Sequence, residues 1–176
     1  MGIFFLVGII LAKESHSAMG LITNFVKVRL DGKIIDESLK PRQMIDLGWA
    51  PCIVTELRWQ SDGRIVSKQF PEGVLAKLLP GKTSIALIET YDVNRAPLSA
   101  MSVIESTGDL LYSIPNLQVV MGKNLSGSFC WFEPSTDDTE NCFSAVFQAD
   151  IDGNLVQYKF DFDIASGKIQ KISASR

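Results

Sequence analysis

Histidine is almost absent from this chain, because the only one among 176 residues is His16. Ser-His-Asp and Cys-His catalysis both need an imidazole as the base, and zinc, iron and copper sites commonly use histidine ligands. The three cysteines, Cys52, Cys130 and Cys142, lack the spacing of a zinc cluster, and no glycine loop of the Walker or dinucleotide type is present. We therefore expect no catalytic residue, no metal ligand and no cofactor.

Clusters of basic residues are also lacking. Lys and Arg total 17 against 20 Asp and Glu, which gives a formal net charge of −3, and the basic residues are scattered singly. Nucleic acid is therefore not an expected partner. Carboxylates are plentiful, so a histidine-free enzyme that uses a pair of them stays open as an alternative.

Long apolar runs are missing except at the start of the chain. Residues 3–12 form an apolar run that is too short to span a bilayer comfortably but fits the core of a secretory signal. Ser15 and Ser17 supply small residues for cleavage before Ala18. No Lys or Arg precedes the run, so an uncleaved anchor or a start at Met19 stays open. We expect a signal peptide at 1–17 and one domain at 18–176, periplasmic or secreted, with no stable membrane span after leader removal.

Asp-Gly pairs recur between β-rich runs, and such pairs favour tight hairpins. They occur at Asp31-Gly32, Asp62-Gly63 and Asp152-Gly153. We expect an α+β fold, predominantly an antiparallel β-sheet with a C-terminal meander and two or three short helices. The expected helices are 71–79 and 97–106, and 41–47 is expected as a short helix or turn. The expected hairpins are 24–36 and 52–70, with Trp59 opposite Val66, and the expected strands include 83–91 and 117–121.

The last third of the chain predicts its own strand register. With Asp152-Gly153 as a two-residue turn, the apolar and aromatic residues of both strands fall on one face and mostly polar residues on the other. The expected pairs on the apolar face are Ala149 with Val156, Phe147 with Tyr158, Ala145 with Phe160, and Phe143 with Phe162. On the other face they are Gln148 with Gln157, Val146 with Lys159, and Ser144 with Asp161.

The same pattern predicts a disulfide. If Cys130 lies opposite Cys142, then Phe129 faces Phe143 and Trp131 follows on the same face. In an exported protein three cysteines are expected to give one bridge and one spare thiol. We expect a Cys130–Cys142 disulfide, worth on the order of 3 kcal/mol by loop closure, and a buried thiol at Cys52.

Acidic residues are concentrated between these two cysteines, at Glu133, Asp137, Asp138 and Glu140. A solvated hairpin tip is one explanation, and a calcium site is another. The third is a negative surface that a disulfide holds in place for a partner, because a restrained loop loses less entropy on binding. We take these four residues as the candidate partner-binding site, for a protein partner with a basic surface.

The segment "AVFQADIDGNLVQYKFDFDIASGKIQKI", residues 145–172, resembles the strand portion of PepSY-type domains. Its order is a strand, an Asp-Gly turn, an aromatic-rich strand, a small-Gly-Lys turn and a short final strand. Those domains are similar to the inhibitory propeptides of secreted peptidases. The resemblance covers 28 of 176 residues and implies an extracytoplasmic, non-catalytic role in restraining another protein.

These observations favour an exported, non-enzymatic protein-binding domain. Its most concrete form is an inhibitor or immunity-type protein that neutralises a secreted enzyme or toxin. The main alternative is a carrier of a small ligand or lipid in the cell envelope, with an apolar cavity under a curved sheet. The histidine-free carboxylate enzyme is the second alternative.

Overall fold

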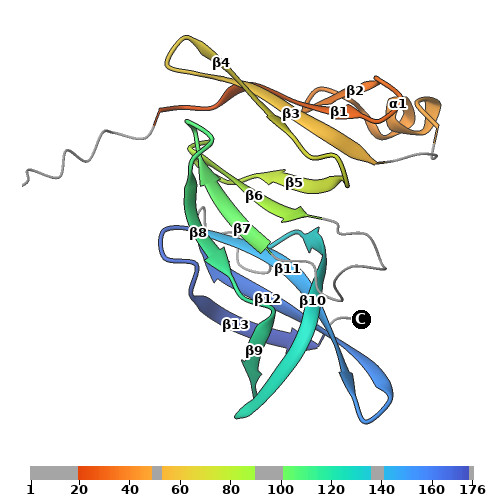
Figure 1. The fold of residues 1–176 in the computed structure, drawn as a ribbon, viewed down its shortest axis with the longest axis vertical. Helices are drawn as coiled ribbons and strands as arrows, with labels where there is room; N and C mark the ends of the chain where they lie inside the picture. Colours follow the sequence, from red (N-terminus) through yellow and green to blue (C-terminus); the bar gives the residue numbers. More distant parts are fainter. Residues whose placement is uncertain (1–19, 49–52, 90–100, 136–140, 175–176) are drawn as a thin grey trace, which may run out of the picture.

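The computed structural model describes residues 20–48, 53–89, 101–135 and 141–174. Within these ranges the chain forms strands β1 to β13 and one short helix, α1 (Figure 1). The expected leader, residues 1–17, lies outside them. The helix is Pro41–Asp46, and the strands are Thr23–Arg29 (β1), Ile34–Asp36 (β2), Val54–Ser61 (β3), Arg64–Gln69 (β4), Val74–Leu78 (β5), Ser84–Glu89 (β6), Met101–Glu105 (β7), Leu110–Ile114 (β8), Leu117–Val120 (β9), Lys123–Glu133 (β10), Cys142–Ile151 (β11), Asn154–Asp163 (β12) and Ile169–Ala174 (β13).

The fold is nearly all β, so the expectation of an α+β fold with two or three short helices is wrong. Strands β5 and β7 lie inside the segments expected as the helices 71–79 and 97–106. Leucine, alanine and lysine in β5 favour a helix by intrinsic propensity. Pairing with β6 and burial of Val74 and Ala76 decide the outcome instead, because tertiary context overrides local preference.

Other expected elements are confirmed. Helix α1 lies within the expected 41–47, and the hairpin of β3 and β4 pairs Trp59 with Val66. At its tip, Asp62 and Gly63 have φ angles of 50° and 73°. This is the left-handed conformation that a two-residue hairpin turn requires and that glycine adopts at no steric cost.

The strands form three antiparallel layers, with the middle one between the other two (Figure 1). We call them the N-terminal layer (β2-β1-β3-β4), the middle layer (β5-β6-β7-β8) and the C-terminal layer (β13-β12-β11-β10-β9). On β6, Ile85 and Leu87 pack with the N-terminal layer, whereas Ala86 and Ile88 pack with the C-terminal layer. A strand that is buried on both faces explains why β6 is an almost continuous apolar run.

The predicted register of the C-terminal meander is confirmed at every expected pair of β11 and β12. The apolar face of these strands forms one side of an aromatic core. Phe147 lies 5.4 Å from Phe160 between ring centroids, and Phe143 lies 5.3 Å from Phe162. The strand order of the segment that resembles PepSY-type domains is therefore observed, while the resemblance itself stays a prediction.

The expected register of β10 is wrong, and the error lies at Cys130. Phe129 faces Phe147 instead of Phe143, the ladder shifts by one residue, and Trp131 faces Val146. An extra residue in one strand reverses the alternation of side chains, so Trp131 points to the face opposite that of Phe129.

This bulge also separates the two cysteines. Cys142 lies opposite Asp163 on β12, and Val146, the residue of β11 at the level of the bulge, is four residues further along the strand. Four residues of a strand span about 14 Å, whereas a disulfide needs Cα atoms within about 7 Å of each other. Cys130 and Cys142 are both free thiols in the structure, and the expected disulfide is not formed.

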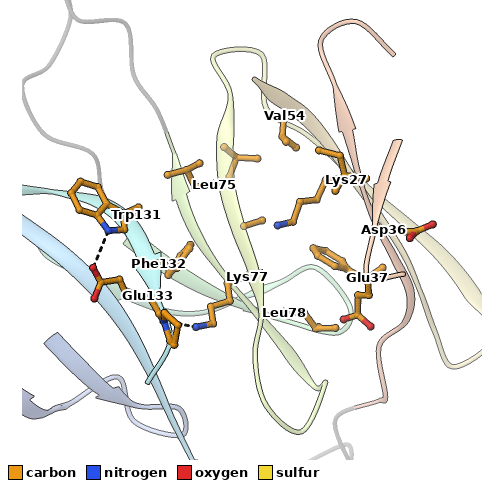
Figure 2. A pocket seen from close by; sticks show the side chains of 15 residues that line it. Lys27, Asp36, Glu37, Val54, Leu75, Lys77, Leu78, Trp131, Phe132 and Glu133 are labelled. Carbon is orange, nitrogen blue, oxygen red and sulfur yellow. Dashed lines mark hydrogen bonds between the residues drawn. The ribbon is translucent and has the colours of Figure 1, made fainter. Parts of the chain in front are cut away.

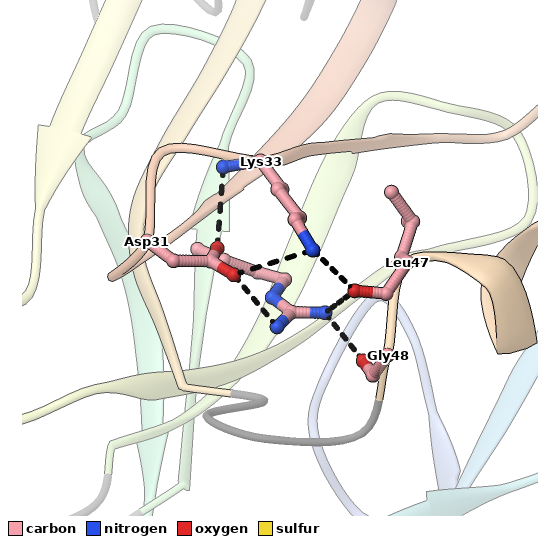
Figure 3. A network of polar contacts seen from close by, with 5 residues as sticks. Asp31, Lys33, Leu47 and Gly48 are labelled. Atoms are coloured by element: carbon pink, nitrogen blue, oxygen red, sulfur yellow. Dashed lines mark hydrogen bonds and ion pairs between the residues drawn. The ribbon is translucent and has the colours of Figure 1, made fainter.

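The C-terminus of α1 is attached to the first hairpin by Arg29, which is buried. Figure 3 shows the polar network around Asp31, Lys33, Leu47 and Gly48 to which this contact belongs. Arg29 donates to the carbonyl oxygens of Gly48 at 2.8 Å and Leu47 at 3.4 Å, and to the Asp31 carboxylate at 2.9 Å. Lys33 also donates to the Leu47 carbonyl, at 2.6 Å. Cations at a helix C-terminus satisfy its unpaired carbonyls and its dipole. No helix in the described ranges is long and apolar enough to cross a membrane.

Candidate binding cleft

A cleft of about 740 Å³ opens on the side of the molecule where β5 is the outermost strand of the middle layer. All five residues of β5 line it. Successive side chains of a strand point to opposite faces, so a cleft that meets all of them must run along the edge of the strand. The N-terminal layer supplies one wall, with Phe25, Lys27 and Ile35, and the C-terminal layer supplies the other, with residues 131–134 (Figure 2).

The outer edge of β5 carries backbone groups with no paired strand among the described residues. The amide of Leu79 donates to the carbonyl of Ser84 at 3.0 Å, directly across the ladder. In an antiparallel pair, hydrogen-bonded positions alternate with positions whose N–H and C=O groups point away. Leu75 and Lys77 therefore bond to β6, and the backbone groups of Ala76 and Leu78 point outward along the cleft.

Lys27 points from the inner face of β1 into the cleft (Figure 2). It shares a cross-strand row with Ile35 and Leu57, and Leu57 is fully buried. Burial lowers the pKa of Lys27 below its usual value, and the nearby charge of Glu37 only partly opposes this shift. Within the described residues the Lys27 ammonium has no hydrogen-bond or ion-pair partner. A half-buried charge that is left unpaired is unusual and is typical of functional sites.

The opposite wall is held together by a polar network. Lys77 donates to the backbone carbonyl of Glu133 at 2.7 Å, and Lys159 donates to the carbonyl of Pro134 at 2.6 Å. The Glu133 carboxylate accepts from the Trp131 indole at 3.3 Å and lies 3.8 Å from the Lys159 ammonium. These contacts fix the end of β10 at the rim, and Trp131 remains 39% exposed there. Half-exposed tryptophans at the rim of a groove are frequent anchors in protein interfaces.

Each carboxylate that lines the cleft already has a partner. Glu37 pairs with Lys82 at 3.1 Å, and Glu133 is held as described above. Hydrogen bonds from the side chain and backbone of Ser38 lower the pKa of Asp36. Two lysines of the lining, Lys27 and Lys77, have no carboxylate partner among the described residues, and of the two only Lys77 donates a hydrogen bond, to the Glu133 carbonyl. The uncompensated charge in the cleft is therefore positive and is least satisfied at Lys27, which favours an acidic group on whatever occupies the cleft.

The structure places only part of the predicted site. Glu133 lies in the cleft wall, whereas Asp137, Asp138 and Glu140 lie outside the described residues. In the parts of the chain that the structure describes, no group of three or more His, Cys, Asp or Glu side chains could hold a metal ion.

Sequence reasoning missed Lys27. In the run Phe25, Val26, Lys27, Val28, a lysine between valines is normally assigned to solvent. The alternation of side chains along a strand could have indicated that Lys27 faces the interior. Residues i and i+2 share a face, and Phe25, two positions before Lys27, is buried.

Comparisons with known proteins give one informative match. No protein-family model matches the sequence, and no curated protein matches it. The chain is similar to a chain in the solved structure of Tne2 in complex with Tni2, with a TM-score of 0.79 and 29% sequence identity. The alignment covers 89% of this chain and 100% of that chain. A protein with this architecture is therefore known in a complex of two proteins.

Proposed function

We propose that this protein is a non-enzymatic, immunity-type protein that neutralises a secreted enzyme or toxin by binding it. The observation that carries the proposal is the cleft along β5, where an open strand edge, an unpaired Lys27 and a half-exposed Trp131 lie together. These are features of a surface that recognises a protein, because they combine backbone pairing, an aromatic anchor and an uncompensated charge.

The structural comparison supports a protein partner. The similar chain comes from a structure of Tne2 in complex with Tni2, and it matches along its whole length. The similar chain belongs to a complex of two proteins, and we propose that this chain also acts by binding a second protein. Export to the periplasm or the medium is part of the same proposal and derives from the apolar run at 3–12.

The carrier alternative receives less support from the core. That hypothesis places an apolar cavity under the curved C-terminal sheet. In the described residues this space is filled by aromatic side chains that contact each other, including Phe129, Phe147 and Phe160, each at most 1% exposed. The cleft of about 740 Å³ lies instead at the edge of the middle layer, along β5.

The test begins with affinity capture from the host's envelope and culture fluid, followed by purification of the captured protein. Calorimetric titration then compares the wild type with Lys27→Glu and with Lys123→Glu. Lys123 is an exposed lysine on β10 outside the cleft, so its reversal makes the same charge change. We expect Lys27→Glu to weaken binding at least about tenfold, to abolish protection of cells that express the partner, and to leave the fold intact. Equal affinity of the two variants would refute the cleft as the binding site.

A separate variant tests the acidic loop. Reversal of Asp137, Asp138 and Glu140 to lysine changes three charges that the sequence analysis assigned to a basic partner surface. Loss of affinity in this variant, with an unchanged melting temperature, supports a second contact at the loop. Unchanged affinity assigns these residues to a solvated turn.

A further inference from the structure

We infer that the partner enters the cleft as an extended acidic segment that pairs with the open edge of β5 and places a carboxylate against Lys27. This inference rests on the proposed function and specifies the partner's chemistry at the same site. It follows from three features of the cleft: its course along a strand edge, the direction of the backbone groups of β5, and the sign of its uncompensated charge.

The backbone geometry favours a strand as the inserted element. Ala76 and Leu78 present their N–H and C=O groups to the cleft, as the alternation of the β5–β6 ladder requires. An incoming strand lies about 4.8 Å from β5 in the plane of the middle layer and would satisfy these groups. A helix uses its backbone N–H and C=O groups in its own hydrogen bonds, so it could not pair with the outward groups of β5.

The two walls give such a segment a place on either side. The N-terminal and C-terminal layers both contribute side chains that line the cleft beside the edge of β5 (Figure 2), and adjacent sheets pack about 10 Å apart. A strand in this cleft alternates its side chains between the walls. One set would face Phe25 and Lys27, and the other would face Phe132, with Trp131 at the rim of the cleft.

The charge selects the side chain that faces the N-terminal wall. Val74, Ala76 and Leu78 point toward that wall and pack with its apolar cluster. A residue that pairs across from Ala76 shares this face and is directed to the wall that carries Lys27. A carboxylate there gains a charge-assisted hydrogen bond from an ammonium that is already stripped of much of its water.

Synthetic peptides test this without the natural partner. The probe is acetyl-Thr-Thr-Val-Glu-Val-Thr-Thr-amide, with two comparison peptides. One has Gln at the centre. The other is N-methylated at the central Glu and at the two threonines next to the valines, because the N–H groups of these residues face β5 when the Glu pairs antiparallel across from Ala76. Binding to the full chain is followed by NMR titration of backbone amides. We expect the largest shifts at Ala76 and Leu78. We expect the Gln peptide to bind about tenfold more weakly, and the N-methylated peptide to bind more weakly still.

A protein variant tests whether the preference for the Glu peptide depends on Lys27. In Lys27→Gln the preference for Glu over Gln should disappear, while Lys123→Glu should retain it, and melting curves confirm that both variants are folded. Equal affinity for the Glu and Gln peptides in the wild type, shifts located away from β5, or no binding of any peptide at millimolar concentration would each overturn the inference. Such a failure leaves the proposed function standing if the captured partner still distinguishes Lys27→Glu from wild type.

Discussion

Replacing Lys27 by methionine should stabilise the folded protein while it weakens partner binding. Methionine keeps the length and the apolar body of the side chain and removes the charge. In the folded protein that charge is desolvated, and no described residue supplies a hydrogen bond to compensate it. The Lys27 charge therefore lowers the stability of the folded wild type. Such a loss of stability is expected where a residue is retained for binding.

The size and the pH dependence of the effect both follow. Single changes that relieve such a conflict stabilise by about 0.5–2 kcal/mol, which corresponds to a rise in Tm of roughly 1–8 °C for a domain of this size. Because burial lowers the pKa of Lys27 in the folded state, the unfolded chain binds the proton more tightly. The loss of stability caused by the Lys27 charge is therefore fully present at pH values below the pKa of Lys27 in the folded protein. It is relieved as the pH rises from that pKa to 10.5, the usual pKa of a lysine.

The assay is differential scanning calorimetry of both proteins between pH 7 and pH 10.5, beside a matched control. Lys68 lies in the same cross-strand row as Lys27, on the other side of Leu57, but it donates to the Gly108 carbonyl at 3.0 Å. Lys68→Met should lower Tm, because it removes a satisfied hydrogen bond. If Lys27→Met also lowered Tm at pH 7, or if its effect did not decline toward pH 10.5, the assignment of an unpaired, desolvated ammonium would be wrong.

Three further predictions concern the fold. Phe129→Ala should destabilise by about 3–5 kcal/mol, because the ring is 1% exposed and contacts Phe147, Phe160 and Phe162; denaturant unfolding measures this, and a loss below 1 kcal/mol would contradict the core position. Hydrogen bonds from Arg58 and Ser67 lower the pKa of Glu56 to about 2, so the Tm advantage of wild type over Glu56→Gln should hold above pH 4.5 and vanish as pH falls through 2. Asp31→Asn should cost about 1–3 kcal/mol and accelerate amide exchange in α1, because Arg29 then loses its charge partner; unchanged exchange in residues 41–48 would argue against this coupling.

The sequence pattern was sufficient to predict strand pairing where both strands and their turn belong to one hairpin. The ten-residue strands β11 and β12 are joined by Asp152-Gly153, and both residues adopt the left-handed conformation that the turn needs. A single register then buries the aromatic residues of both strands together, since a shift of one residue would expose them. The pairing could therefore be predicted residue by residue, and in the β3–β4 hairpin the one predicted pair, Trp59 with Val66, is also observed.

Local pattern failed where a neighbour distant in sequence decides the structure. β5 contains helix-favouring residues, and only its position beside β6 and below the N-terminal layer makes it a strand. The bulge at Cys130 depends on how β10 fits against β11, and it reverses Trp131 and separates the cysteines. No periodicity in β10 alone contains that shift of one residue.

The sequence by itself therefore determined the hairpins, the aromatic face of the C-terminal meander and the scarcity of histidine that argues against common catalytic chemistry. Tertiary structure alone decided the three-layer stack, the open edge of β5 and the position of Lys27 in the wall of the cleft. The physical reason is range: turn conformation and side-chain alternation act within a hairpin, whereas the desolvation of a charge and the exposure of a strand edge depend on which layers pack around them.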